Sequence, residues 1–141
     1  MTSNLTGKEY NGVRVEDGKL VSFTKTVPEL GPHDILLRIT HSGVCHSDAV
    51  YAAIGAPIAL GHEGIGIVEA VGSRVTMLKI GERAGAGLHR WSCGACKYCS
   101  DGLDIHCYGR VNMGEGDFDN GTFGEYYVGK EDFLCTFRGV A

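Results

Sequence analysis

The sequence lacks the long apolar run of a membrane-spanning helix, and it lacks an excess of basic residues. No stretch approaches the roughly 20 consecutive apolar residues of a membrane span. The polar start, MTSNLTGKEY, has no apolar core of the kind found in secretory signal peptides. The net charge is −4, with both signs interspersed and no basic patch for nucleic acid. These absences predict a cytoplasmic protein with neither a membrane nor a nucleic-acid partner.

Internal repeats, linkers and long helical periods are also missing, so the 141 residues are interpreted as one domain. The apolar content of 43% and the charged content of 21% are typical of a globular chain. Short β-rich runs separated by turn residues recur at Leu20–Thr26, Ile35–Thr40, Gly64–Val71 and Phe123–Val128. This pattern predicts a mainly β fold, either a sandwich or a partly open barrel. One short helix is expected over Ser47–Ile54, capped by Ser47 or Asp48.

The most specific pattern is C-x2-C-x2-C-x7-C in the segment WSCGACKYCSDGLDIHC, formed by Cys93, Cys96, Cys99 and Cys107. Four thiolates in a compact segment suit tetrahedral Zn²⁺, and such a closed shell leaves no position for a substrate. The pattern therefore predicts a structural zinc site. An iron–sulfur cluster, disulfide pairs and free thiols are the alternatives. Without a secretory signal, the six cysteines fit a reducing compartment.

A second candidate metal site involves Cys45 in SGVCHSD and His62 in LGHEGIG. Glycines on both sides of His62–Glu63 allow the backbone to turn sharply near a ligand. Catalytic zinc takes three protein ligands and keeps one open position, which Cys45, His62 and Glu63 could provide. Asp48 could orient an imidazole from behind. The alternative is a buried cysteine and a hydrogen-bonded histidine without metal, with His46 as a solvated loop residue.

Together, GVCHSD, GHEGIGIVEAVG, KIGERAGAG and the four-cysteine segment resemble the amino-terminal catalytic domain of zinc-dependent medium-chain alcohol dehydrogenases, closest to the cinnamyl-type branch. The resemblance covers roughly residues 20–133. It implies an alcohol dehydrogenase GroES-like domain over residues 1–141, with a partly open β-barrel and short helices. It also implies that a four-cysteine zinc lobe protrudes at about residues 91–109.

The resemblance further implies roles for individual residues. Cys45 and His62 match two ligands of a catalytic zinc, and Glu63 matches a glutamate that can exchange onto that metal. Zinc acidifies alcohols and polarises carbonyl groups. We therefore expect one structural and one catalytic Zn²⁺, and a small-molecule alcohol, aldehyde or other carbonyl substrate.

Three more roles come from the same resemblance. Asp48 matches the carboxylate that supports the ligand histidine, and Ser47 matches the hydroxyl that passes the substrate proton outward. His46 occupies the position that faces the cofactor pyrophosphate in the family. Val50 replaces a residue that is polar in some members, so a relay beyond Ser47 is not expected.

Two departures from the family stand out. The sequence contains no βαβ segment with a glycine fingerprint, so NAD(P) is not expected to bind stably. The third cysteine ligand of the family is missing at its expected position. Cys135, in FLCTFRGVA, is either a substitute ligand or an ordinary cysteine.

Three functions follow as hypotheses. The first is a truncated alcohol-dehydrogenase-like zinc domain that does not transfer hydride alone. The second is a stand-alone zinc enzyme for redox-neutral carbonyl chemistry, such as aldol-type reaction, elimination, hydration or cyclisation. The third is a non-catalytic binding or scaffold domain. Without a second domain, an exposed apolar face could support a homo-oligomer. Aromatic residues would either line that face or lie in the core: Phe123, Tyr126, Tyr127, Phe133 and Phe137.

Overall fold

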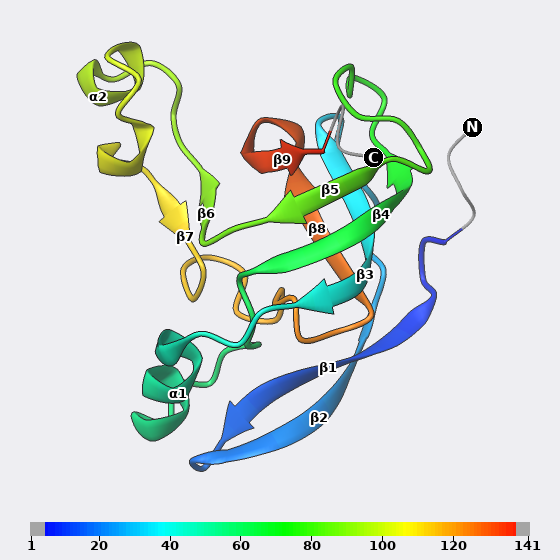
Figure 1. Cartoon of the computed structure of the whole chain (residues 1–141), viewed down its shortest axis with the longest axis vertical. Helices are drawn as coiled ribbons and strands as arrows, with labels where there is room; N and C mark the ends of the chain where they lie inside the picture. The colour runs from blue at the N-terminus through cyan, green and yellow to red at the C-terminus, as the bar shows by residue number, and fades with distance from the viewer. Residues whose placement is uncertain (1–4, 138–141) are drawn as a thin grey trace.

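The computed structural model describes residues 5–137 and is built mainly from β-strands (Figure 1). The strands are β1 (Glu9–Glu16), β2 (Lys19–Thr26), β3 (Asp34–Ser42), β4 (Gly64–Val71), β5 (Arg83–Ala86), β6 (His89–Trp91), β7 (Val111–Asn112), β8 (Tyr126–Lys130) and β9 (Leu134–Thr136). The helical elements are α1 (His46–Ala53), α2 (Lys97–Ser100) and two 3₁₀ turns, η1 (Asp104–His106) and η2 (Glu131–Phe133). All strand pairs in these residues are antiparallel. The mainly β prediction is confirmed.

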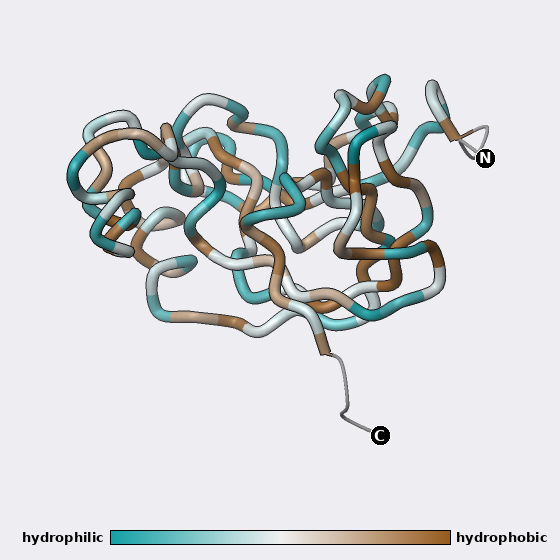
Figure 2. Tube along the Cα trace, turned by 90° about the horizontal axis from the view of Figure 1, so that it is seen from above, coloured by the Kyte–Doolittle hydropathy of each residue, from teal (hydrophilic) through white to brown (hydrophobic). Residues whose placement is uncertain are grey.

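A curled five-stranded sheet in the order β8-β3-β4-β5-β9 forms the half-barrel. Ile35, Leu36 and Leu37 of β3 are fully buried, because both faces of the sheet are covered. On one face, Ile35 and Leu37 belong to a cluster with Val68 of β4 and Leu134 of β9. Hydrophobic and hydrophilic stretches alternate along the chain, and several hydrophilic stretches lie on outer bends of the trace (Figure 2). Burial on both sides explains the continuous apolar run Ile35-Leu36-Leu37 in the first half of β3.

The β1–β2 hairpin covers the other face of the sheet. Leu36 and Tyr126 pack there against Tyr10 of β1. Strand β1 was not identified from sequence, because it contains Asn11-Gly12, a pair typical of turns. Gly12 instead lies within the strand, where a Cβ would approach the Phe23 ring at 2.8 Å.

Two predicted boundaries need correction. Helix α1 begins at His46 and its N-cap is Cys45, not Ser47 or Asp48. Asp48 occupies the third helical position, from which its carboxylate accepts a hydrogen bond from the Cys45 N–H at 3.0 Å. The strand predicted at Phe123–Val128 begins only at Tyr126, since Phe123 instead exchanges backbone hydrogen bonds with Leu60 and Val13.

The segment between β6 and β7 forms a protruding lobe that carries α2 at its far end (Figure 1). The base of the lobe is closed by the antiparallel pairing of β6 with β7. The cysteine cluster of this segment is consistent with a zinc lobe. None of the helices in residues 5–137 has the length and apolarity needed to cross a membrane.

Candidate metal centres

The four lobe cysteines, Cys93, Cys96, Cys99 and Cys107, converge as their spacing predicts. All four Sγ atoms lie within 4.8 Å of one another. Cys107 is fully buried, while Cys93 is exposed at the outer side. All six cysteines of the chain are free thiols, so the disulfide alternative does not describe this arrangement. The donor set is the one that structural zinc prefers.

Backbone N–H groups stabilise the thiolate form of two of these cysteines, which is the form that binds a metal cation. Hydrogen bonding from the Cys99 backbone is the main cause that lowers the pKa of Cys96, to about 6. Hydrogen bonding from Ala95 and then Cys96 likewise lowers the pKa of Cys93. The Cys93 N–H acts to lower the pKa of Cys107 as well, but desolvation and the neighbouring thiols outweigh it and raise that pKa to about 11. A metal ion would replace these protons and offset the repulsion among the thiolates.

A second cluster forms where α1 meets the start of β4. The ligand atoms of Cys45, His62 and Glu63 lie within 4.8 Å of one another. Cys45 is placed by its role as the N-cap of α1, whereas His62 and Glu63 directly precede β4. The turn into this strand depends on Gly61, which has φ +90° and no room for a Cβ beside the Phe123 backbone. The predicted sharp turn is therefore present.

The orientation of His62 distinguishes its two ring nitrogens. Nε2 faces Ser47 Oγ at 3.2 Å and a Glu63 carboxylate oxygen at 4.0 Å. Nδ1 is buried without a hydrogen bond and lies 3.5 Å from Asp48 Oδ1. Asp48 is only 4% exposed and is fixed by the backbone N–H groups of Cys45 and Gly61, at 3.0 Å each. A carboxylate behind Nδ1 favours the tautomer in which Nδ1 carries the hydrogen and the lone pair of Nε2 is available to a metal ion.

Ser47 and Gly43 complete the surroundings of this cluster. The Ser47 hydroxyl lies 3.4 Å from Cys45 Sγ as well as near His62, so it sits at the edge of the candidate metal position. A Cβ on Gly43 would come within 2.5 Å of the Glu63 carboxylate, so glycine leaves the space that this side chain occupies. Sequence reasoning missed Gly43, and SGVCHSD shows no signal for its contact with Glu63.

The residues present fit a zinc ion at this second cluster. Thiolate, imidazole and carboxylate are the three donor types that zinc accepts, and three protein ligands leave an open position. The buried imidazole has a carboxylate behind one nitrogen and the other donors in front of the second. A histidine kept only for packing would not need both features.

The remaining predicted residues lie outside this cluster. His46 is exposed at the first position of α1. Cys135 is exposed on β9, and the group formed by Cys45, His62 and Glu63 does not include it. Tyr126 and Tyr127 are buried, so these two aromatics belong to the core, as one of the two alternatives proposed. Exposed apolar side chains on α1 and its flanking residues include Val44, Val50 and Ile54.

Comparison with known proteins agrees with this geometry. The model of the alcohol dehydrogenase GroES-like domain matches residues 31–138. The chain is 35% identical over 103 residues to a probable cinnamyl alcohol dehydrogenase 2 of Picea abies, covering 70% of this chain and 29% of that protein. It is 41% identical over 106 residues to a probable formaldehyde dehydrogenase of Bacillus subtilis, covering 69% and 30%. These relatives are therefore about three times as long as the matched part.

The solved structures give the same result. A cinnamyl alcohol dehydrogenase from Sorghum bicolor superposes with a TM-score of 0.82 at 26% identity, covering 92% of this chain and 40% of that one. The corresponding enzyme of Helicobacter pylori, crystallised with NADP(H), also gives a TM-score of 0.82. With the family match extending over most of the sequence, the chain belongs to the alcohol dehydrogenase GroES-like domain family.

Proposed function

We propose that the described residues form the zinc-binding catalytic domain of an alcohol-dehydrogenase-type oxidoreductase. One structural zinc would be held by the four lobe cysteines and one catalytic zinc by Cys45, His62 and Glu63. The observation that carries the proposal is the pair of distinct ligand clusters, of which only the second has an oriented imidazole and a nearby hydroxyl. The substrate would be a small-molecule alcohol, aldehyde or other carbonyl compound.

The chain's own residues have separate tasks in this proposal. A bound zinc would acidify an alcohol or polarise a carbonyl group. The Asp48 carboxylate, 3.5 Å from His62 Nδ1, would orient the ring so that Nε2 faces the metal. The Ser47 hydroxyl, beside Cys45 Sγ and His62 Nε2, accepts the substrate proton and passes it to solvent. Val50, on the same helix, is exposed and apolar, which supports a relay that ends at Ser47.

Hydride transfer would require a nicotinamide bound elsewhere. A dinucleotide site is built from parallel strands joined by a helix, and residues 5–137 contain only antiparallel pairs. NAD(P) would therefore not bind stably to these residues alone. In this proposal the exposed His46 faces the cofactor, and the apolar side chains of Val44, Val50 and Ile54 contact another protein surface, such as a second copy. The six free thiols support a cytoplasmic location.

Cobalt substitution tests the proposal directly. The 141-residue chain loaded with Co²⁺ should bind two ions, and its visible absorption spectrum should change when 2,2,2-trifluoroethanol or benzaldehyde is added. An absorption spectrum that does not change when either compound is added would contradict an open metal site. Turnover of an alcohol with NAD(P)⁺ by the chain alone would contradict the cofactor part of the proposal. Conversion of a carbonyl substrate without a two-hydrogen mass change would favour the redox-neutral alternative.

A further inference from the structure

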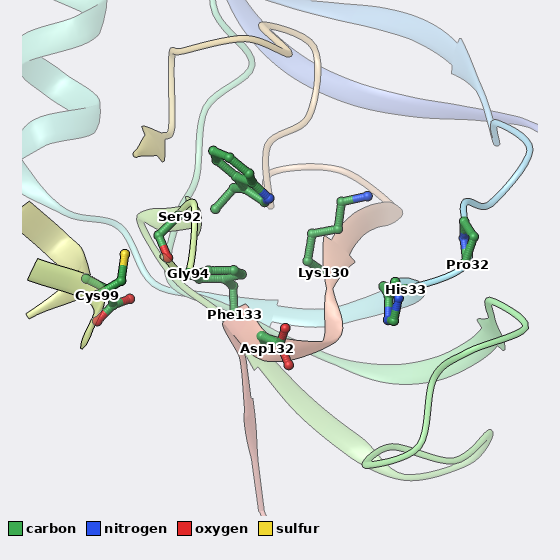
Figure 3. A pocket seen from close by; sticks show the side chains of 10 residues that line it. Pro32, His33, Ser92, Gly94, Cys99, Lys130, Asp132 and Phe133 are labelled. Carbon is green, nitrogen blue, oxygen red and sulfur yellow. The ribbon is translucent and has the colours of Figure 1, made fainter. Parts of the chain in front are cut away.

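An open pocket of about 520 Å³ lies between the lobe and one end of the curled sheet (Figure 3). The lobe side provides Trp91, Ser92, Gly94, Cys99 and Asp104, and the sheet side provides Pro32, His33, Lys130, Asp132 and Phe133. The volume is within the range of about 300–1,000 Å³ that small-molecule sites occupy. None of these residues belongs to the cluster of Cys45, His62 and Glu63, so the pocket is a separate feature.

Aromatic side chains form much of the wall. Trp91 is 41% exposed, which is unusual for a residue of this size unless it faces a partner or ligand. Phe133, in η2, is held by an edge-to-face contact with His89 of β6, with ring centroids 5.1 Å apart. Two aromatic rings that line one cavity provide π faces toward which a cation is attracted.

The charges around the pocket also favour a cation. Asp132 points into the region beside Phe133 (Figure 3), and no partner for its carboxylate is found among residues 5–137. The ammonium group of Lys130 is already paired with Asp34 and extends away from Asp132 (Figure 3). Asp104 adds a second carboxylate, whose neighbour at 3.1 Å is His89 Nε2. The pocket therefore has more unneutralised negative charge than positive charge.

The lobe strengthens this bias, since Cys99 lines the pocket. Four thiolates around one Zn²⁺ carry a net charge of −2, so a lobe that holds zinc as proposed above would place that charge at the pocket wall. A negative wall next to aromatic faces discriminates against carboxylates and in favour of ammonium ions.

We propose that this pocket binds a small organic ammonium ion, with the cationic group between Trp91 and Phe133 and close to the Asp132 carboxylate. The ligand would carry an apolar or aromatic group next to its nitrogen, because the pocket is too large for a bare ammonium ion. The site goes beyond the proposed catalytic function and does not require it, since its binding partners are distinct.

The single tryptophan of the chain makes the proposal measurable, because Trp91 lines this pocket. It also lines a neighbouring pocket beside Arg90 and Asp117, so the variants described below assign the binding position. Zinc-loaded protein would be titrated with benzyltrimethylammonium chloride, at constant ionic strength. We expect a saturable change in Trp91 emission with a Kd below about 1 mM. Phenylacetate and N-benzylacetamide, the anionic and neutral controls, should bind at least about tenfold more weakly. Equal binding of all three compounds would overturn the proposal.

Variants tested by calorimetry assign the contacts. Asp132→Asn should weaken binding of benzyltrimethylammonium about fivefold, and Trp91→Leu about tenfold. Trp91→Phe should retain part of the affinity, and both Trp91 and Asp132 are exposed, so folding should be preserved. Asp17→Asn, in the β1–β2 turn, is the matched charge control and should leave Kd unchanged. An unchanged Kd in Asp132→Asn, or the same loss in Asp17→Asn, would contradict the site.

Discussion

The two ligand clusters of this chain are built in opposite ways. The lobe draws its four thiols from one segment of 15 residues, Cys93–Cys107, whose ends are joined by the β6–β7 pair. The second cluster joins Cys45 at the start of α1 to His62 and Glu63 at the start of β4, and so depends on the fold between them. The first cluster contains four identical donors from one loop. The second contains three different donors that only the folded domain brings together.

This difference suits the first cluster to stabilising the lobe and the second cluster to binding a substrate. A closed shell of four thiols has no position left for a substrate, whereas three mixed donors leave one. Within residues 5–137, the lobe thiols form hydrogen bonds with backbone N–H groups and with one another, but the second cluster has a carboxylate and a hydroxyl around its imidazole. If the two clusters are independent in this way, a substitution can remove the metal ion from one cluster without removing it from the other.

The largest effect is expected for Cys107→Ser. Cys107 is the buried thiol of the lobe and one of its four proposed ligands, so its loss should weaken zinc binding there by more than about 100-fold and leave one zinc per chain by mass spectrometry. The lobe should also become sensitive to proteolysis. Cys135→Ser, an exposed cysteine on β9, is the matched control. Loss of a zinc ion in that variant would instead support Cys135 as a ligand.

The variant His62→Asn should empty only the second cluster. We expect one zinc per chain, loss of the cobalt spectral response to alcohols, and a decrease in unfolding free energy of about 1–2 kcal/mol from the buried ring. His41→Asn, on the exposed side of β3, should retain both ions. If His62→Asn also released the lobe zinc, the two clusters would not be independent.

A smaller effect is expected for Asp48→Asn. The amide oxygen can accept only one of the two backbone hydrogen bonds that the carboxylate accepts from Cys45 and Gly61, and the side chain no longer provides a negative charge beside His62 Nδ1. Metal affinity at the second cluster should fall about 10- to 100-fold, while the lobe affinity stays constant. Competition with a zinc chelator measures both values in one experiment. Unchanged affinity would show that Asp48 only caps the helix.

The smallest and most local effect concerns the lobe without metal. Alkylation requires the thiolate, so its rate at each cysteine rises with pH through the pKa of that thiol. At pH 7, iodoacetamide should modify Cys96, with a pKa of about 6, well before Cys107, with a pKa of about 11. Peptide mass spectrometry measures the order, with Cys135 as an exposed reference. Equal rates at Cys96 and Cys107 would show that the lobe loses this structure when the metal is removed.

The two clusters also differ in how far sequence alone predicts them. The lobe could be predicted from spacing, because its geometry is contained in one loop. For the second cluster, the residues alone left a metal-free alternative open and the family resemblance favoured the metal site. The contacts of Gly61 with Phe123 and of Gly43 with Glu63 are visible only in the structure. Strand β4 was predicted with its observed bounds from its β-rich run, but β1 was missed because Asn11-Gly12 lies inside it. Local periodicity cannot show that Gly12 is needed for the packing of Phe23.

The paired base of the lobe has a consequence for protein engineering. Trp91 and Val111 are partners across β6 and β7, so the intervening chain leaves and re-enters the domain at neighbouring positions. The lobe between β6 and β7 can be replaced by a short hairpin turn, or moved to another antiparallel strand pair, without extra linker residues. The lobe could therefore be transferred to another β protein as a unit, where bound metal would cross-link the inserted loop.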